Sequence, residues 1–135
     1  MINNLNDFNR SLGEVMMYAQ FIEHDIKEIY LKILGSSSYE NADAIKMMTL
    51  GETLLNIQEY DIRRKLNIFS IDDYLSLKQI TKIRNYYAHV VYSSFAYSDD
   101  EDKFIQAAQR LEADIKTLAD LQNLIEEKKM GIIGK

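Results

Sequence analysis

One stretch near the start of the chain decides the fold: about residues 4–34, NLNDFNRSLGEVMMYAQFIEHDIKEIYLKIL. Its apolar side chains recur at spacings of three and four residues without a break. They are Leu5, Phe8, Leu12, Val15, Ala19, Ile22, Ile26, Ile29 and Ile33. This spacing places them on one face of a helix, and such a face must pack against other elements. The pattern predicts a long amphipathic helix of a bundle, ended by Gly35 and the serines behind it.

Three further helical segments follow, and no alternation typical of strands competes with them. The first covers about residues 40–60, with a break near Gly51, and a connector with the basic run Arg63-Arg64-Lys65 follows over residues 61–73. The second runs from the capping pair Asp72-Asp73 to about Phe95, and the third starts after Ser98. We therefore expect an all-α, antiparallel bundle of four to five helices. Residues 1–130 form the single domain, and residues 131–135 form a flexible tail.

The composition excludes several classes of site. The 135 residues include no cysteine and no proline, and the net charge is −5. Without cysteine there is no disulfide, no thiolate zinc site and no cysteine nucleophile. The negative charge argues against non-specific binding of duplex DNA. No apolar run approaches the roughly 18 residues of a membrane span, and the polar N-terminus does not resemble a signal peptide. We expect a cytoplasmic protein that does not bind membranes.

A metal site is not expected. The only histidines are His24 and His89. His24 and Glu28 are four residues apart and share a helix face, but carboxylate bundles that bind two metals use Glu-x-x-His, and Phe21 stands at the glutamate position. A solvated helix face explains His24 better. Phosphate-binding glycine loops and hydrolase elbows are also missing from the sequence, so no cofactor is expected.

The segment from Gln79 to His89, QITKIRNYYAH, carries the residue types for RNA cleavage. The guanidinium of Arg84 suits phosphate oxygens, Asn85 can donate and accept hydrogen bonds, and His89 can exchange a proton near neutral pH. The nucleophile is then the 2′-hydroxyl of the substrate. On a helix, Arg84 and His89 are about 140° apart and about 7.5 Å apart along the axis. One helix makes a poor complete site, whereas two copies about a two-fold axis can bring four side chains to one cleft.

The run Arg84-Asn85-Tyr86-Tyr87-Ala88-His89, with its apolar lead-in, resembles the motif of the HEPN domain family. The segments from Phe21 to Tyr30 and from Met48 to Leu54 look similar to bacterial members. The resemblance implies a helical bundle that dimerises around the motif helix and cleaves RNA without a metal, as a toxin or a phage-defence component, with an antitoxin protein as a further partner. It implies that Arg84 and His89 are catalytic and that Asn85 supports them.

Several interpretations stay open beside this one. Lys82, Tyr86 and Tyr92 are candidates for substrate binding, although tyrosines near such a motif also line helix interfaces. Arg84 and His89 can instead make structural contacts in a non-catalytic binding or regulatory protein of the same type, or in an unrelated helical bundle. In one HEPN subgroup a modified tyrosine stands two positions after the histidine. Here Tyr92 stands three positions after His89, which departs from that form of regulation.

Overall fold

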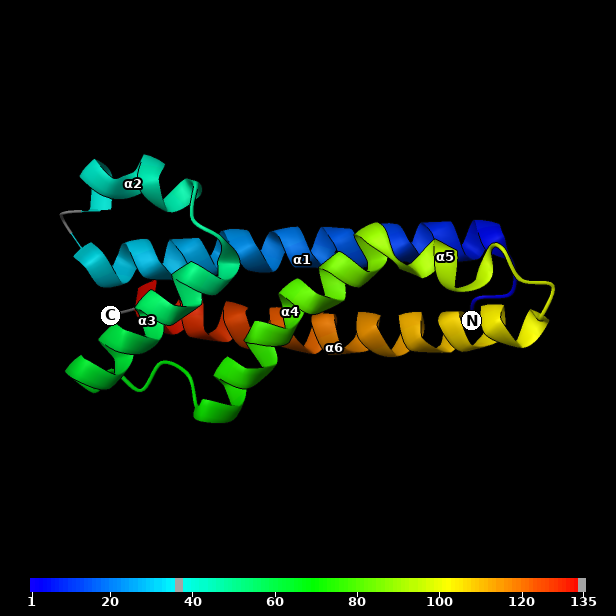
Figure 1. Cartoon of the computed structure of the whole chain (residues 1–135). Helices are drawn as coiled ribbons and strands as arrows, with labels where there is room; N and C mark the ends of the chain where they lie inside the picture. The colour runs from blue at the N-terminus through cyan, green and yellow to red at the C-terminus, as the bar shows by residue number, and fades with distance from the viewer. Residues whose placement is uncertain (36–37, 134–135) are drawn as a thin grey trace.

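The chain folds into an all-α bundle, as expected from the sequence (Figure 1). The computed structural model describes residues 1–35 and 38–133, without the side chains of residues 38–41 and 133. Within these ranges the elements are α1 (Leu5–Leu34), α2 (Ser38–Lys46), α3 (Leu50–Arg64), α4 (Ile71–His89), α5 (Val91–Phe95) and α6 (Glu101–Ile133). The same part of the chain contains no strand. It also contains no helix with the length and hydropathy needed to cross a membrane.

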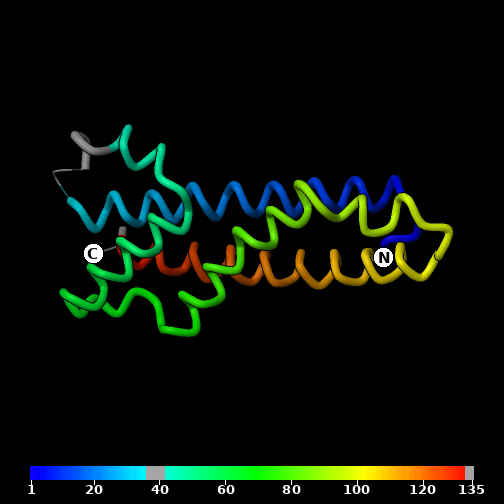
Figure 2. Tube along the Cα trace, viewed as in Figure 1, coloured from blue at the N-terminus to red at the C-terminus, as the bar shows by residue number. Residues whose placement is uncertain are grey.

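The two longest helices, α1 and α6, lie side by side along the whole bundle and run in the same direction (Figures 1 and 2). Phe8 contacts Phe104 near their starts, and Asp25 accepts a hydrogen bond from Gln122 near their ends. The expected antiparallel packing is made by α4, which runs in the opposite direction to α1 and α6 and leads through α5 to the start of α6. The bundle therefore has one long returning leg, and this leg carries the residues from Gln79 to His89.

The core follows the apolar face predicted for α1. Phe8, Val15, Ile22 and Ile26 are fully buried, and Ala19 and Ile29 are nearly so. Leu12 and Ile33 are partly buried at the edge of the core, whereas Leu5 is 52% exposed. Leu54, Ile57, Leu77 and Ile80 complete the core from α3 and α4, together with Leu111 and Leu118 from α6.

Local capping places the helix boundaries, and several differ from those expected. The break predicted near Gly51 falls between Lys46, where α2 ends, and Leu50, where α3 begins. Thr49 caps α3 and accepts a hydrogen bond from the amide of Glu52. Ser70, not the pair Asp72-Asp73, caps α4, and Asp73 completes the capping box. Gly35 caps the end of α1 with a φ of 71°, where glycine is favoured.

The connector between α3 and α4 is shorter than expected, because α3 continues through the basic run as far as Arg64. Lys65 ends the helix in a left-handed conformation, with a φ of 54°. Asp61, buried in the last turns of α3, then holds the loop. Its Oδ1 accepts the amide of Ile68 at 3.0 Å, and its Oδ2 accepts the amide of Phe69 at 3.2 Å and the hydroxyl of Tyr74 at 2.7 Å. One carboxylate thus fixes the angle between α3 and α4.

Two further boundaries differ near the ends of the later segments. The segment expected to run unbroken to Phe95 is divided after His89, where Val90 leaves the helical conformation and α5 begins. At the other end, α6 continues through Ile133, so residues 131–133 are helical where a tail was expected. Ile132 packs against the core, which explains the extension. Residues 134–135 lie outside the described part of the chain.

Candidate functional site

An exposed stripe runs the length of α4 and carries half of the six predicted site residues. Its members recur at spacings of three and four residues and all face solvent: Ile71, Leu75, Lys78, Lys82, Asn85 and His89. The structure therefore brings Lys82, Asn85 and His89 together on one face, as the helical period requires. We call this set the α4 stripe.

Arg84 lies beside the stripe and not on it. Its Nη1 donates to Oε2 of Glu23 on α1 at 3.2 Å, and its side chain is 37% exposed. The other carboxylate oxygen of Glu23 pairs with Lys27 at 3.4 Å. Since α4 is a regular helix from Arg84 to His89, the two side chains point in directions about 140° apart. The helix alone does not bring the guanidinium and the imidazole together.

His89 is the last residue of α4 and is exposed. Its imidazole makes no hydrogen bond or ion pair with any residue that the structure describes. The helix stops here because Val90 adopts a φ of −122°, while its amide still donates to the carbonyl of Tyr86. Both ring nitrogens of His89 are thus available to exchange a proton with a bound molecule.

The side of α4 opposite the α4 stripe is anchored to α6. The buried Tyr87 hydroxyl donates to Oδ2 of Asp114 at 2.6 Å, and the guanidinium of Arg110 lies 3.7 Å from the same carboxylate oxygen. Burial, followed by this hydrogen bond, raises the pKa of Tyr87 well above its usual value. The neutral tyrosine therefore acts as a donor at physiological pH and holds the motif helix in place.

The two tyrosines predicted to bind substrate both have packing partners within the chain. The ring of Tyr86 is covered by the guanidinium of Arg110, 3.6 Å from its centroid, and contacts the ring of Tyr87 edge to face. The hydroxyl of Tyr92 donates to Asn9, and its ring packs on Phe8. These contacts place both tyrosines off the α4 stripe, so their role in binding substrate stays a prediction.

Next to the stripe lies a groove of about 700 Å³ between α1, the end of α2, the start of α3 and α4. Five of its lining side chains are cationic and one is acidic. The cations are Lys27, Lys46, Lys78, Lys82 and Arg84, and the acid is Glu23. The lining thus carries a net charge of +4, in a chain whose net charge is −5. We call this feature the cationic groove, and such a concentration of one sign attracts anions.

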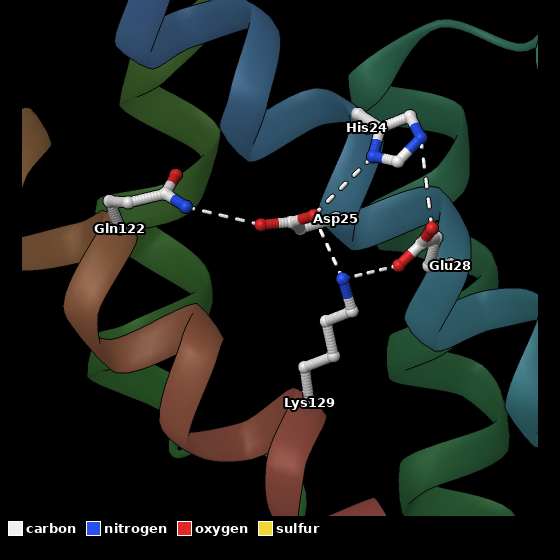
Figure 3. Close-up of polar contacts among 5 residues, drawn as sticks. All are labelled: His24, Asp25, Glu28, Gln122 and Lys129. Atoms are coloured by element: carbon white, nitrogen blue, oxygen red, sulfur yellow. Dashed lines mark hydrogen bonds and ion pairs between the residues drawn. The ribbon is translucent and has the colours of Figure 1, made fainter. Parts of the chain in front are cut away.

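A second polar cluster surrounds His24, in the same part of α1 as Glu23 and Lys27 of the groove (Figure 3). His24, Asp25 and Glu28 place donor atoms within 4.8 Å of one another, which is the spacing of a metal site. The ammonium of Lys129, however, already lies between the two carboxylates and contacts both. The hydrogen bond to Glu28 raises the pKa of Lys129, burial opposes the rise, and the hydrogen bond to Asp25 adds to it. The cluster is therefore an ion-paired contact between α1 and α6.

The expectation for this cluster was partly met. The side chain of His24 is 70% exposed, in keeping with a solvated face, whereas Asp25 is 13% exposed and lies between two helices. Its partner Gln122 donates to Oδ2 of Asp25 at 3.1 Å. Helical spacing on α1 alone does not show that α6 covers this side of Asp25.

Sequence reasoning missed most of the cationic groove. Lys27, Lys46 and Glu23 lie on segments far from the motif and meet it only in the folded chain. The one signal in the sequence was the spacing of Lys78 and Lys82, which are four residues apart and hence on one face of a helix.

Comparison with known proteins gives no match: no protein-family model, no curated protein and no solved structure is similar to the chain at a significant level.

Proposed function

We propose that this protein is a metal-independent endoribonuclease of the HEPN type that works as a homodimer. The observation that carries the proposal is the exposed position of Asn85 and His89 on the α4 stripe, beside Arg84 and the cationic groove. A proton-transferring imidazole, an amide and a guanidinium thus adjoin a surface suited to phosphates.

The reaction needs two proton transfers and stabilisation of one phosphoryl group. An imidazole takes the proton of the ribose 2′-hydroxyl as its oxygen attacks phosphorus. The bond from phosphorus to the 5′-oxygen breaks, and that oxygen takes a proton from a protonated imidazole. The products are a 2′,3′-cyclic phosphate and a 5′-hydroxyl. Arg84 donates to the phosphoryl oxygens as negative charge accumulates on them.

Two copies supply the two imidazoles. Within one copy, Arg84 and His89 diverge, and the chain has one histidine in the motif. A two-fold axis near the end of α4 gives one cleft with two copies of each residue. Apolar surface adjoins this point, since Val90 directly follows His89 and is 48% exposed. The same proposal includes a biological role as a toxin or phage-defence component, with an antitoxin protein as a partner.

A second candidate is a binding or regulatory protein without catalysis. The ion pair between Arg84 and Glu23 favours it, because a guanidinium held by a carboxylate of the same chain has a structural role. In this case RNA is bound but not cut.

Cleavage of RNA by the purified protein in EDTA separates the two. We expect cleavage by the wild type, with cyclic-phosphate and 5′-hydroxyl ends, and its loss in His89→Ala and Arg84→Ala. His24→Ala is the matched control, since it removes the other exposed histidine and should leave cleavage unchanged. Circular dichroism verifies folding of each variant. A 3′-hydroxyl product, or full activity in folded His89→Ala, would refute the proposal.

A mixing experiment tests the shared cleft. Arg84→Ala and His89→Ala protomers, each inactive alone, are exchanged to form heterodimers. A single cleft built by both copies retains one Arg84 and one His89 in the heterodimer. Water then makes one of the two proton transfers, and we expect slow but measurable cleavage. If the mixture stays inactive and the protein sediments with the mass of a monomer, the dimer is contradicted.

A further inference from the structure

The cationic groove has charges that the chain itself does not neutralise. The ammonium groups of Lys46 and Lys82 have no acceptor among the described residues, and Lys78 donates to the neutral Gln58 at 3.2 Å. Only Lys27 and Arg84 have a carboxylate partner, and they share the one from Glu23. Cations gathered in one groove repel one another, and a bound polyanion relieves that repulsion.

Two of the cations, Lys78 and Lys82, begin a line of polar side chains along α4. Lys78, Lys82, Asn85 and His89 follow one another on the α4 stripe, in steps of about 6, 4.5 and 6 Å by the helical rise. A single phosphate touches one or two of these groups. A chain of phosphates can follow them from the groove to the imidazole.

Part of the groove lining is apolar and suits bases. Met47 is 86% exposed there, although a methionine normally has a partner to pack on, and Met48 and Leu50 lie beside it. Methionine adapts its shape to flat groups. A ligand with both phosphates and bases therefore fits this groove better than a free phosphate or polyphosphate.

The first turn of α3 adds hydrogen-bond donors to the same wall. Thr49 caps the helix, and the amides of Leu50 and Gly51, in the first turn, have no acceptor within it. Such amides bind phosphate oxygens. Since Gly51 has no side chain, a ligand can approach the backbone closely.

From these observations we infer that the cationic groove binds the backbone of single-stranded RNA and leads it along the α4 stripe to His89 of the same protomer. This inference rests on the proposed function, which it extends by naming the path of the substrate. Lys46, Lys78 and Lys82 contact phosphates, and Met47 contacts bases. The volume of about 700 Å³ is within the range of small-ligand sites and accommodates part of one strand.

The test measures binding apart from cleavage. The probe is a short fluorescent 2′-O-methyl RNA, which cannot be cut because it lacks the nucleophile. Its affinity for the wild type and for a Lys46→Gln/Lys82→Gln variant is measured by anisotropy over a range of salt concentrations. Loss of two phosphate contacts should lower the slope of log K against log salt by about 1.4 and the affinity at 0.1 M salt by about 25-fold.

A matched variant controls for net charge. Lys32→Gln/Lys116→Gln removes two exposed lysines outside the groove, and its affinity should stay within twofold of the wild type. Equal losses in the two variants would show that only overall charge matters and would overturn the inference. Equal binding of a duplex of the same sequence would overturn the single-strand assignment.

The outcomes separate this inference from the proposed function. If the groove variant binds RNA as the wild type does, while His89→Ala abolishes cleavage, the proposed ribonuclease function is supported and RNA binding by the groove is refuted. If the groove variant loses binding, while no RNA is cut by the wild type, the groove stands and the protein binds RNA without cleaving it. Absence of binding by the wild type at low salt overturns the groove.

Discussion

Replacing Asp61 by asparagine should destabilise the whole bundle, because this carboxylate joins α3 to the loop and to α4. It is 6% exposed and accepts three hydrogen bonds, from the amides of Ile68 and Phe69 and from the hydroxyl of Tyr74. Asparagine has nearly the same shape but one acceptor oxygen. If its oxygen keeps the bond from the amide of Ile68, its NH₂ group takes the place of Oδ2. It then faces the amide of Phe69 and the hydroxyl of Tyr74, and both donors lose their acceptor.

The expected loss follows from those two bonds. A hydrogen bond to a charged group contributes about 1.5–3 kcal/mol, and a buried donor without an acceptor adds its own penalty. Removing a buried charge offsets part of this loss. A net destabilisation of about 3 kcal/mol follows. With about 2.1 cal/mol/K of unfolding entropy per residue and 135 residues, this lowers Tm by about 10 °C.

Thermal and urea unfolding measure the effect by circular dichroism. Asp120→Asn is the control, since Asp120 is exposed on α6, and its Tm should change by about 1 °C or less. A double-mutant cycle with Tyr74→Phe should show a coupling of at least about 1 kcal/mol. If Asp61→Asn lowers Tm by less than about 3 °C, this carboxylate does not fix the junction of α3 and α4.

Three further predictions concern other parts of the chain. Burial, followed by a hydrogen bond to a carboxylate, raises the pKa of both Tyr74 and Tyr87, so the folded state keeps protons that the unfolded state loses above pH 10. The free energy of unfolding therefore falls as the pH rises above 10, by about 1.4 kcal/mol per pH unit for each tyrosine. Urea unfolding from pH 9 to pH 11 measures this slope, and a free energy that does not change with pH would contradict the prediction. Lys65→Gly should raise Tm by about 3 °C, because the left-handed conformation costs a side chain about 1 kcal/mol; an unchanged or lower Tm in calorimetry would contradict this. Glu23→Gln should tighten binding of 2′-O-methyl RNA about threefold, since it frees Arg84 from an ion pair of about 0.5–1 kcal/mol, and weaker binding would show that the pair orients Arg84 for RNA.

The helices themselves could be predicted from local patterns. The unbroken apolar spacing from Phe8 to Ile29 marked the face of α1 that is buried, and the acidic start after Ser98 marked the beginning of α6. Errors arose where a boundary depends on contacts beyond the helix. The end of α6 extends because Ile132 reaches the core, and α3 continues through Arg64 because Asp61 receives the loop behind it.

The candidate site was predictable only along one helix. Asn85 and His89 share a face by the helical period, and so do Lys78 and Lys82, whatever the rest of the chain does. The partner of Arg84 was not predictable, since Glu23 lies 61 residues earlier and reaches it only because α1 and α4 pack together. The same holds for Tyr86, whose ring is covered by Arg110 of α6.

The sequence by itself therefore determined that this protein is a helical bundle, which face of α1 is buried, and which motif residues share one side of α4. Those properties depend on neighbours within a few residues, and the helical period fixes them. The tertiary structure alone decided that α1 and α6 run in the same direction and that Lys27, Lys46, Lys78, Lys82 and Arg84 gather in one groove. Residues distant in the chain meet according to how whole helices pack, and that packing is a sum over the entire core and not a property of any one segment.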